Sequence, residues 1–411
     1  PIEKKNMGTF FKEYFDRTTF FACLALIAIG LLSIYSATFD TNAAISFHKQ
    51  ILWASLGFVL MIAVMFTPLR VIQRSSMVVF AVSLIALAAV LAVGHRAYGS
   101  QSWFGFGGMG GQPSEFVKIT TILALASYLS RSETNMGSIK DITMAFAILL
   151  LPISLIMMQP DLGTSLTFVA MFVPVLYWAG ASNFLIVAIV APGVVALAAI
   201  IGTTTFLVVL AAVGAALYFF REDRFFSAVM FGVNAMVGIF VQVVYEKLPL
   251  YQQKRIATFL DPNNDPLGAG YNVIQAKVAI GSGGFWGKGY LQGTQTQLNF
   301  IPKQWTDFIF CVPGEEFGFF GAIVVLALFA VILIHGIRVG YVVKNRFGSI
   351  VAIGIVSLFA VHVFVNIGMS VGLMPVIGIP LPFLSYGGSS LCSYMIMMGL
   401  LMNVYANRKE Y

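Results

Sequence analysis

Twelve apolar runs recur along the 411-residue chain, each long enough to cross a lipid bilayer as a helix of roughly 20 residues. Short polar connections separate most of them, which leaves little room for a soluble domain. Only 10% of the residues are charged, whereas soluble domains carry roughly 25%. We therefore expect an all-α polytopic membrane protein with about twelve transmembrane helices. The expected spans are residues 18–38, 47–66, 76–94, 115–130, 141–158, 163–180, 182–202, 204–220, 225–245, 319–340, 348–372 and 384–406.

The basic residues indicate how these helices are oriented. The first run follows a basic segment without a small-residue cleavage pattern, which predicts a retained helix instead of a removable signal peptide. Because Lys and Arg favour the cytoplasmic side of short loops, both termini are expected in the cytoplasm. The net charge of +7 is thus explained by topology and does not indicate a nucleic-acid partner. The basic residues predicted inside are Lys4, Lys5, Lys12, Arg17, Arg70, Arg74, Arg131, Lys140, Arg221, Arg224, Arg338, Lys344, Arg346, Arg408 and Lys409.

Residues 246–318 form the longest polar segment and are predicted to be one large extracytoplasmic loop. A loop of this length is usually functional. Residues 271–280 have helical character, whereas the six glycines of 281–293 predict a shape set by the backbone. The glycine run does not match a phosphate-binding loop, because Ser282 and Gly289 replace the required Gly and Ser or Thr.

Glu115 and Lys118 are charged residues inside an apolar run, where a charge costs roughly 2.5–3.5 kcal/mol on insertion scales. Their spacing places them on one helix face after Pro113 and Ser114, with Ser114 as the expected cap. Two interpretations remain open. The pair is either an internal ion pair, or it presents the Lys118 cation to an anionic substrate headgroup.

Two interrupted segments also carry polar residues. Asp161 follows Pro160 at a turn, where it either caps the next helix or has a functional role. Residues 378–390 contain prolines and glycines that one continuous helix cannot accommodate. Irregular backbone at membrane depth is tolerated where it lines a cavity.

Asp307 gives the strongest catalytic signal. It ends the extracytoplasmic loop and precedes Phe308, Ile309 and Phe310, and apolar neighbours suit a carboxylate to act as a general base. The alternative is a solvated loop aspartate. Glu315 and Glu316 follow, and we expect them at the mouth of a helix that continues to residue 340, where acidic residues are often only dipole partners.

The cysteines and histidines indicate neither a disulfide framework nor a zinc site. The three cysteines have no C-x-x-C spacing, and the four histidines have no neighbour at ligand spacing. The sequence also shows no dedicated metal cage, so a divalent cation such as Mg²⁺ or Mn²⁺ is left open.

Taken together, the motifs resemble the SEDS (shape, elongation, division and sporulation) family of membrane proteins, also called the FtsW/RodA/SpoVE family, and within it the RodA branch. The matching motifs are Gln112-Pro-Ser-Glu-Phe-Val-Lys118, Gln159-Pro-Asp-Leu-Gly-Thr164, Asp265-Pro-Leu-Gly-Ala-Gly-Tyr271, Ile280-Gly-Ser-Gly-Gly284, Gly293-Thr-Gln-Thr-Gln297, Thr306-Asp-Phe-Ile-Phe310, Gly314-Glu-Glu316 and Pro380-Leu-Pro-Phe-Leu-Ser-Tyr-Gly-Gly-Ser-Ser390.

The resemblance implies a peptidoglycan glycosyltransferase that polymerises lipid II on the outer face of the bacterial cytoplasmic membrane, for cell elongation and rod shape. Its implied partner is a class B penicillin-binding protein transpeptidase. The family usually has ten membrane helices, so 182–245 is expected to hold an inserted hairpin within a single membrane domain, 1–411. Trp305 stands where the family commonly has His.

The resemblance also assigns roles to residues of this chain. It places the family's essential acid at Asp307. The substrate-binding residues expected with it are Glu115, Lys118, Asp161, Lys303, Gln304, Ser385 and Ser389.

Two other classes of protein fit some of the same features. A lipid II flippase or secondary transporter also has many helices, broken segments and intramembrane charges. The densest polar chemistry here lies in one outside loop instead of at the midplane of two related halves, which argues against transport. A non-catalytic scaffold for wall synthases has no need of Asp307.

Overall fold

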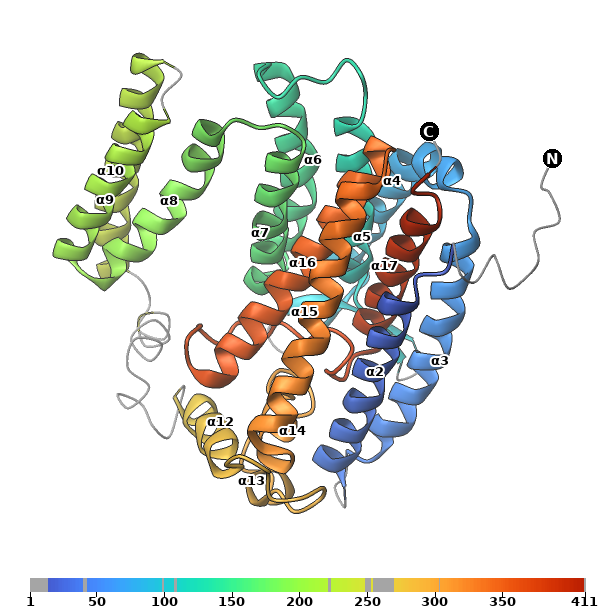
Figure 1. Ribbon diagram of the computed structural model, residues 1–411. Coiled ribbons are helices and arrows are strands. Elements are labelled where there is room, and N and C mark those ends of the chain that lie inside the picture. The colour runs from blue at the N-terminus through green and yellow to red at the C-terminus, as the bar shows by residue number, and fades with distance from the viewer. Residues whose placement is uncertain are drawn as a thin grey trace, which may run out of the picture. The chain divides into compact units, whose positions relative to one another are not determined.

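A computed structural model describes residues 14–39, 43–97, 100–106, 109–220, 223–247, 253, 270–302 and 304–409, and this part of the chain is almost entirely helical (Figure 1). Lys4, Lys5, Lys12, Arg221, Lys303 and residues 265–269 of the Asp-Pro-Leu-Gly-Ala motif lie outside the described residues.

A helix occupies each of the twelve apolar runs. Among the described residues, nine of these helices are long and apolar enough to cross a membrane. The remaining three, α5, α7 and α9, have 17 residues each. At about 1.5 Å per residue this length falls slightly short of the roughly 30 Å hydrocarbon core, so twelve crossings stay a prediction. The helices are α2 (Arg17–Thr38), α3 (Ile45–Phe66), α4 (Leu69–Val93), α5 (Pro113–Leu129), α6 (Ile139–Met157), α7 (Leu162–Trp178), α8 (Asn183–Ile201), α9 (Thr203–Phe219), α10 (Arg224–Lys247), α15 (Gly318–Val342), α16 (Arg346–Val371) and α17 (Gly388–Ala406).

The chain divides into two compact units. Unit 1 comprises Pro1–Thr134, Ile142–Phe172 and Asn272–Tyr411, and unit 2 comprises Asn135–Asp141 and Val173–Tyr271. Unit 2 contains α8, α9 and α10, which share their own apolar cluster around Val195, Ala199 and Phe206. An inserted hairpin within 182–245 stays a prediction.

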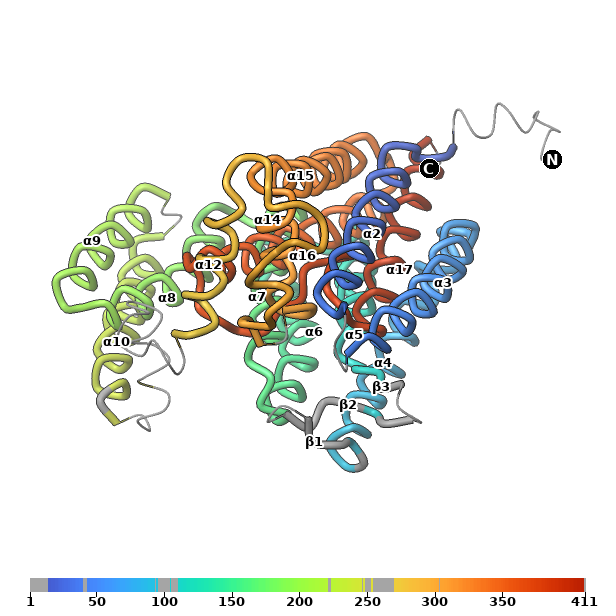
Figure 2. The backbone as a smooth tube through the Cα atoms, turned by 90° about the horizontal axis from the view of Figure 1, so that it is seen from below, coloured from blue at the N-terminus to red at the C-terminus, as the bar shows by residue number. Residues whose placement is uncertain are grey.

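Helices α16 and α17 form the interior of unit 1, where α2, α3, α5 and α15 contact them (Figure 2). In the most apolar part of each helix, 78% of the residues of α16 and 83% of those of α17 are buried, against 22% in α3 and in α15. Gly399 lets α17 approach α3 closely, because a Cβ atom at this position would lie 2.4 Å from the Met61 carbonyl oxygen. The polar residues in the middle of α16, His362 and Asn366, are consequently enclosed by protein.

Several connections rich in basic residues meet at one end of unit 1. Asn403, in the last turn of α17, donates to the carbonyl oxygens of Val64 at 2.9 Å and Met65 at 3.0 Å, near the end of α3. The backbone nitrogen of Lys344 donates to the carbonyl oxygen of Arg408 at 3.5 Å. The short helices α12 (Tyr271–Ser282), α13 (Thr294–Gln297) and α14 (Cys311–Glu316) lie at the opposite end (Figure 1).

The described part of the long polar loop is partly helical, and the predicted helix at 271–280 is confirmed as α12. The glycine run packs backbone against backbone on the end of α14. A Cβ atom at Gly283 would lie 2.1 Å from the carbonyl oxygen of Gly314, and Gly287 has a φ of +82°. Lys288 and Gly289 donate their backbone N–H groups to the carbonyl oxygens of the last two residues of α14. Side chains would prevent this close approach.

One prediction about this end of the molecule was wrong. We expected Glu315 and Glu316 at the start of the helix that continues to residue 340, but they lie in a separate short helix, α14, and α15 begins at Gly318, close to the expected start at 319. The break lies at Gly318, which has a left-handed φ of +62°. Its backbone packs against the glycine run, because a Cβ atom at Gly318 would lie 2.4 Å from the Gly287 nitrogen. Glu315 and Glu316 therefore end one helix instead of starting another.

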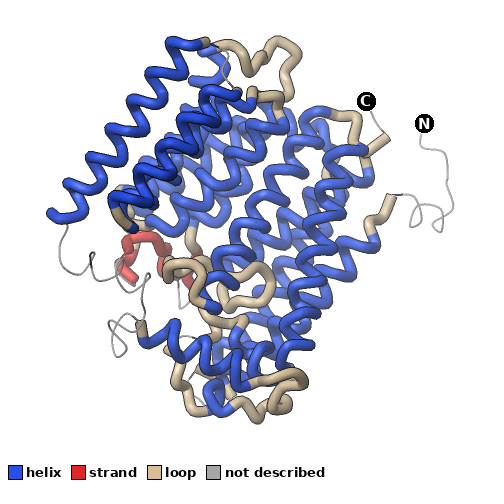
Figure 3. The backbone as a smooth tube through the Cα atoms, turned by 60° about the vertical axis from the view of Figure 1, so that its left-hand side comes forward, coloured by secondary structure: helices blue, strands red, loops and turns tan. Residues whose placement is uncertain are grey.

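A small antiparallel sheet in the connection from α4 to α5 was not predicted. Its strands are β1 (His95–Ala97), β2 (Ser100–Phe106) and β3 (Met109–Gly111), in the order β1-β2-β3 (Figure 3). The strands have three, seven and three residues. Strands of this length are too short to be detected by a search for apolar runs that could cross a membrane.

Candidate active site

Glu115 and Lys118 form the ion pair that their spacing predicts. Pro113 starts α5, which places Glu115 in the first turn. Its Oε1 lies 2.8 Å from Lys118 Nζ, and the two residues are 4% and 1% exposed. Because the lysine is enclosed and already partnered, direct contact with a headgroup requires this part of the site to open. The static geometry thus favours the internal ion pair of the two interpretations.

His362 and Tyr394 extend this pair into a buried network. His362 Nε2 lies 3.5 Å from Lys118 Nζ, and His362 Nδ1 lies 2.9 Å from the Tyr394 hydroxyl. Ser393 Oγ lies 3.4 Å from the second oxygen of Glu115. Side chains from α5, α16 and α17 therefore meet in one polar cluster inside unit 1.

Asp161 caps α7, as one of the two interpretations predicts. Its Oδ1 accepts from the Thr164 nitrogen at 3.0 Å, and its Oδ2 accepts from Thr164 Oγ1 at 2.8 Å. The side chain of Gln112, directly before α5, also donates to Oδ2 at 3.1 Å. Asp161 therefore connects the starts of α5 and α7, and a substrate contact stays a prediction.

Asp307 lies in a turn between the loop and α14 and is partly exposed. The apolar neighbours expected from the sequence are in place, since Phe308, Ile309 and Phe310 are all at most 3% exposed. Asn366 Nδ2 donates to the Asp307 carbonyl oxygen at 2.8 Å. The carboxylate lies beside Gly378, where a Cβ atom would be 3.6 Å from Asp307 Oδ2. The acid thus sits between buried loop residues and the irregular segment before α17.

Residues 378–386, which we call the Pro380 segment, hold the backbone directly before Asp307. Ser385 Oγ donates to the Thr306 carbonyl oxygen at 2.6 Å, and Tyr386 donates its backbone N–H to the Trp305 carbonyl oxygen at 2.9 Å. Ser389, just beyond the segment, accepts from the Gln112 nitrogen at 3.2 Å. The hydroxyls of Ser385 and Ser389 are therefore engaged with backbone, and substrate binding by either stays a prediction.

Gln304 is a buried link between the loop and α2. Its Nε2 donates to the carbonyl oxygens of Thr296 at 2.8 Å and Ala37 at 3.2 Å. Its 0% exposure favours support of the loop over contact with a substrate. Lys303, expected beside it, lies outside the described residues.

Glu315 and Glu316 are adjacent buried carboxylates with opposite surroundings. Burial opposes the charge of Glu315, but hydrogen bonds from Lys288, Gln295 and Thr296 outweigh it and lower its pKa. Burial dominates at Glu316 and raises its pKa. Within the described part of the chain, no three His, Cys, Asp or Glu side chains are placed to hold a metal ion. A divalent cation stays a prediction.

The sequence interpretation missed His362, Tyr394 and Asn366. His362 and Asn366 are polar residues four apart inside the apolar run that became α16, and they are 1% and 0% exposed. Polar residues in such a run are functional suspects by default. That signal was available, but their partners are distant in the sequence and only the fold identifies them.

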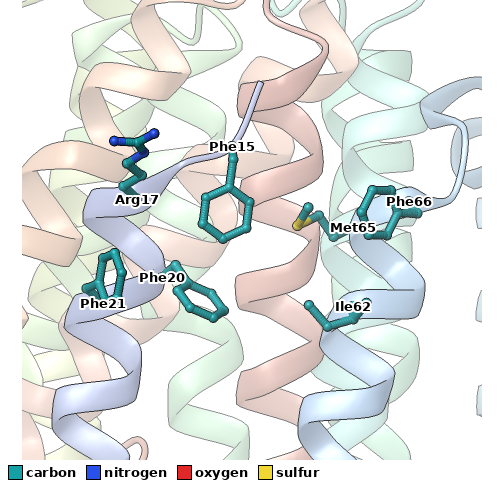
Figure 4. Close-up of a pocket in the computed structure, with 7 residues that line it drawn as sticks. All are labelled: Phe15, Arg17, Phe20, Phe21, Ile62, Met65 and Phe66. Atoms are coloured by element: carbon teal, nitrogen blue, oxygen red, sulfur yellow. The ribbon is translucent and has the colours of Figure 1, made fainter. Parts of the chain in front are cut away.

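A cavity of about 510 Å³ between α2 and α3 is separate from these residues (Figure 4). It lies at the start of α2 and the end of α3, whereas Gln304 contacts the far end of α2. Its lining is apolar except for one arginine, and it contains none of the predicted site residues. The lining residues are Phe15, Arg17, Phe20, Phe21, Ile62, Met65 and Phe66.

The helices and the buried polar network define a multi-pass membrane protein with its candidate site beside one large loop. A family model described as "Cell cycle protein" (FtsW/RodA/SpoVE) matches residues 17–227 and 199–410. The chain belongs to this family.

Curated relatives match nearly the whole chain. It is 34% identical to peptidoglycan glycosyltransferase RodA of Treponema pallidum (96% of this chain, 98% of that one). It is 35% identical to peptidoglycan glycosyltransferase MrdB of Escherichia coli K12 (99% and 98%) and to stage V sporulation protein E of Bacillus subtilis (93% and 94%).

Solved structures share the fold. A chain from a peptidoglycan synthase complex that coordinates polymerization and crosslinking has a TM-score of 0.73 at 25% identity, and the match covers 97% of this chain and 99% of that chain. Rod shape determining protein RodA of Thermus thermophilus has a TM-score of 0.64 at 23% identity, with 97% and 98% covered.

Proposed function

We propose that this chain is a peptidoglycan glycosyltransferase that polymerises lipid II into glycan strands at the outer face of the cytoplasmic membrane. The observation that carries the proposal is its 34–35% identity, over 96–99% of its length, to relatives named for this activity. The placement of Asp307 between the loop and the Pro380 segment supports it, because the residue is partly exposed there while its backbone is held in place.

In the proposed reaction, Asp307 is the general base. It takes the proton from a hydroxyl of the acceptor sugar as that oxygen attacks the anomeric carbon of the donor. The bond from this carbon to the lipid pyrophosphate breaks, and undecaprenyl pyrophosphate leaves with the bonding electrons. One new glycosidic bond forms with inversion. Phe308, directly after the acid, packs into a buried cluster with Ala276, Ile301 and Cys311, which anchors the chain beside Asp307.

The charge that develops on the pyrophosphate needs a cation. Lys118 is our candidate, but its burial and its pairing with Glu115 mean that it serves only after local opening. A divalent ion would supply the same stabilisation. The described residues do not form a cage for one, so no step is assigned to a metal.

We also propose an orientation in the membrane and a partner protein. Both termini face the cytoplasm and the loop at 271–316 faces outward, because the connections rich in basic residues gather at the other end of unit 1. The partner is a class B penicillin-binding protein, since a relative of the same fold belongs to a synthase complex for polymerization and crosslinking. Co-purification in mild detergent tests the pair, and turnover unaffected by the partner counts against it.

The decisive experiment is polymerisation of labelled lipid II by the purified chain in nanodiscs, with and without the candidate partner. Glycan strands that a muramidase digests are the expected product. A flippase would instead move lipid II across proteoliposomes without making polymer, and a scaffold would do neither. Either of these results would overturn the proposed function.

A further inference from the structure

Helix α16 presents two polar side chains, His362 and Asn366, on one face of its buried length. Residues four apart lie one above the other on a helix. Both are enclosed, with exposures of 1% and 0%. A polar side chain inside a membrane helix is costly without partners. The groups that His362 and Asn366 contact therefore indicate what they do.

Asn366 joins two backbone segments that are far apart in sequence. Its Nδ2 donates to the carbonyl oxygen of Asp307 at 2.8 Å and to the carbonyl oxygen of Ile379 at 2.8 Å. A carbonyl oxygen can only accept, so the two contacts fix which end of the amide is nitrogen. The two N–H donors of one amide therefore hold the backbone of Asp307 and the Pro380 segment at a fixed distance from each other.

His362 holds the same segment one residue further on. Its Nδ1 lies 3.1 Å from the Pro380 carbonyl oxygen, and its Nε2 faces Lys118 Nζ at 3.5 Å. The carbonyl needs a donor and the ammonium needs an acceptor. A neutral imidazole with its proton on Nδ1 satisfies both, and the Tyr394 hydroxyl, 2.9 Å from the same nitrogen, is then a second acceptor for that proton.

The Pro380 segment uses this external support at Ile379 and Pro380, because the hydrogen bonds that it makes within itself lie among residues 381–385. Pro380 and Pro382 have no backbone N–H. Gly378 has a left-handed φ of +71°. The segment in turn supplies the donors for the carbonyl oxygens of Trp305 and Thr306, through Tyr386 and Ser385. With Asn366 on the next carbonyl, three consecutive peptide groups ending at Asp307 are held.

We propose that Asn366 is a positioning residue for Asp307, and that His362 supports it by fixing the Pro380 segment relative to Lys118. The inference rests on the proposed function for what Asp307 does once it is in place. Misplacing a catalytic group by about 1 Å costs about 10²-fold in rate. Loss of the two amide donors should lower kcat by that order and leave KM for lipid II within a few-fold.

Two substitutions separate hydrogen bonding from packing. Asn366→Leu keeps the approximate shape and removes both donors. Asn366→Asp keeps the shape and turns a carboxylate toward two carbonyl oxygens, so it should be the worse of the two. Ser357→Ala is the matched control, because Ser357 is a buried serine of the same helix that lies more than two turns before Asn366.

The experiment combines hydrogen–deuterium exchange in nanodiscs with steady-state polymerisation. We expect both Asn366 variants to exchange faster at 304–310 and 378–386, to keep wild-type exchange in α2, and to lose kcat. Ser357→Ala should match the wild type in all three respects. Unchanged exchange in α2 would show that only the two segments near Asp307 have loosened and that the protein has not unfolded.

Each contrary result has a definite meaning. Wild-type exchange and turnover in Asn366→Leu would show that Asn366 is only a packing residue. Faster exchange without loss of kcat, or loss of kcat without faster exchange, would also overturn the positioning role. If the wild-type chain makes no glycan, the proposed function fails. The exchange comparison then still decides whether Asn366 fixes the backbone of Asp307.

Discussion

Ser36, in the last turn of α2, donates a hydrogen bond to Glu316, which ends α14 280 residues later in the chain. Leu291 donates its backbone N–H to the same carboxylate at 3.2 Å. The other oxygen of Glu316 has no hydrogen-bond partner among the described residues. Glu315, directly before it, accepts from Lys288 at 2.8 Å and from several loop groups. We therefore expect these two adjacent carboxylates to have opposite effects on stability.

Glu315 should stabilise the fold at neutral pH. Its pKa is below the usual 4.5 despite burial, because Lys288 and loop N–H groups favour the charged form. A lowered carboxyl pKa contributes stability that is present above pH 4.5 and is lost as the pH falls through the folded value. We expect Glu315→Gln to cost about 2–3 kcal/mol at pH 7, as loss of a buried charged hydrogen-bond acceptor does. Thermal unfolding of the purified protein measures this change.

Glu316→Gln should have the opposite effect. Burial raises the pKa of Glu316 above 4.5, so its stability contribution is complete below pH 4.5 and is lost as the pH rises through the folded pKa. A neutral Gln removes this loss and should raise the melting temperature at pH 7 relative to the wild type, with the difference vanishing in acid. Equal destabilisation by the two substitutions at pH 7 would contradict the assignment.

The long apolar runs predicted where the helices lie, because helix formation in a bilayer depends on local composition. The partners of Asn366 could not be predicted in the same way. They are carbonyl groups at positions 307 and 379, and neither differs chemically from any other backbone oxygen. The break at Gly318, which separates Glu315 and Glu316 from α15, could not be predicted for a related reason. It follows from contact with Gly287, which lies more than thirty residues earlier.

In the candidate site, too, some features follow from local sequence and others only from the whole fold. The i, i+3 spacing of Glu115 and Lys118 and the cap at Asp161 are local geometry, and both contacts were predicted. Burial is a property of the whole fold, so the enclosure of Lys118 could not be read from its own helix. Because Lys118 is enclosed, its geometry favours a structural ion pair with Glu115 over direct contact with a substrate.

A double substitution separates the two roles of Lys118. Lys118→Met alone strands the buried Glu115 carboxylate and should cost about 3–5 kcal/mol, as breaking a buried ion pair does. Glu115→Gln combined with Lys118→Met removes both charges and should recover most of that stability. We expect the double variant to fold and still lack turnover, because the leaving pyrophosphate has lost its cation. Recovery of turnover in the double variant would show that the pair is only structural.

His362 offers a matched pair of variants. Asn at this position can place its amide nitrogen near the position of Nδ1 and keep the bond to Pro380, whereas Gln reaches the position of Nε2 and keeps the contact with Lys118. We expect His362→Asn to retain more polymerase activity than His362→Gln, because the Pro380 segment supports Asp307. The reverse order in a steady-state assay would assign the main role to the lysine contact.

Cysteine labelling tests the orientation in the membrane. Gln292 is exposed in the loop at one end of unit 1, and Ser132 is exposed in the connection after α5. A membrane-impermeant maleimide applied to intact spheroplasts should label Gln292→Cys and reach Ser132→Cys only after permeabilisation. The native cysteines at 23, 311 and 392 are buried, which keeps the background low. The opposite pattern would place the loop in the cytoplasm and remove Asp307 from the outer face.

Asp307→Asn is the substitution on which the proposed chemistry depends. The change is nearly isosteric and removes the basic oxygen, while the Asp307 carbonyl that Asn366 holds is unaltered. General-base catalysis contributes about 10²–10⁴-fold, so we expect kcat to fall by at least this factor. Melting temperature and partner binding should stay at wild-type values. Glu133→Gln, an exposed carboxylate in the connection after α5, is the matched control and should leave turnover unchanged. Polymerisation by Asp307→Asn at close to the wild-type rate would exclude the base and favour a scaffold or a flippase.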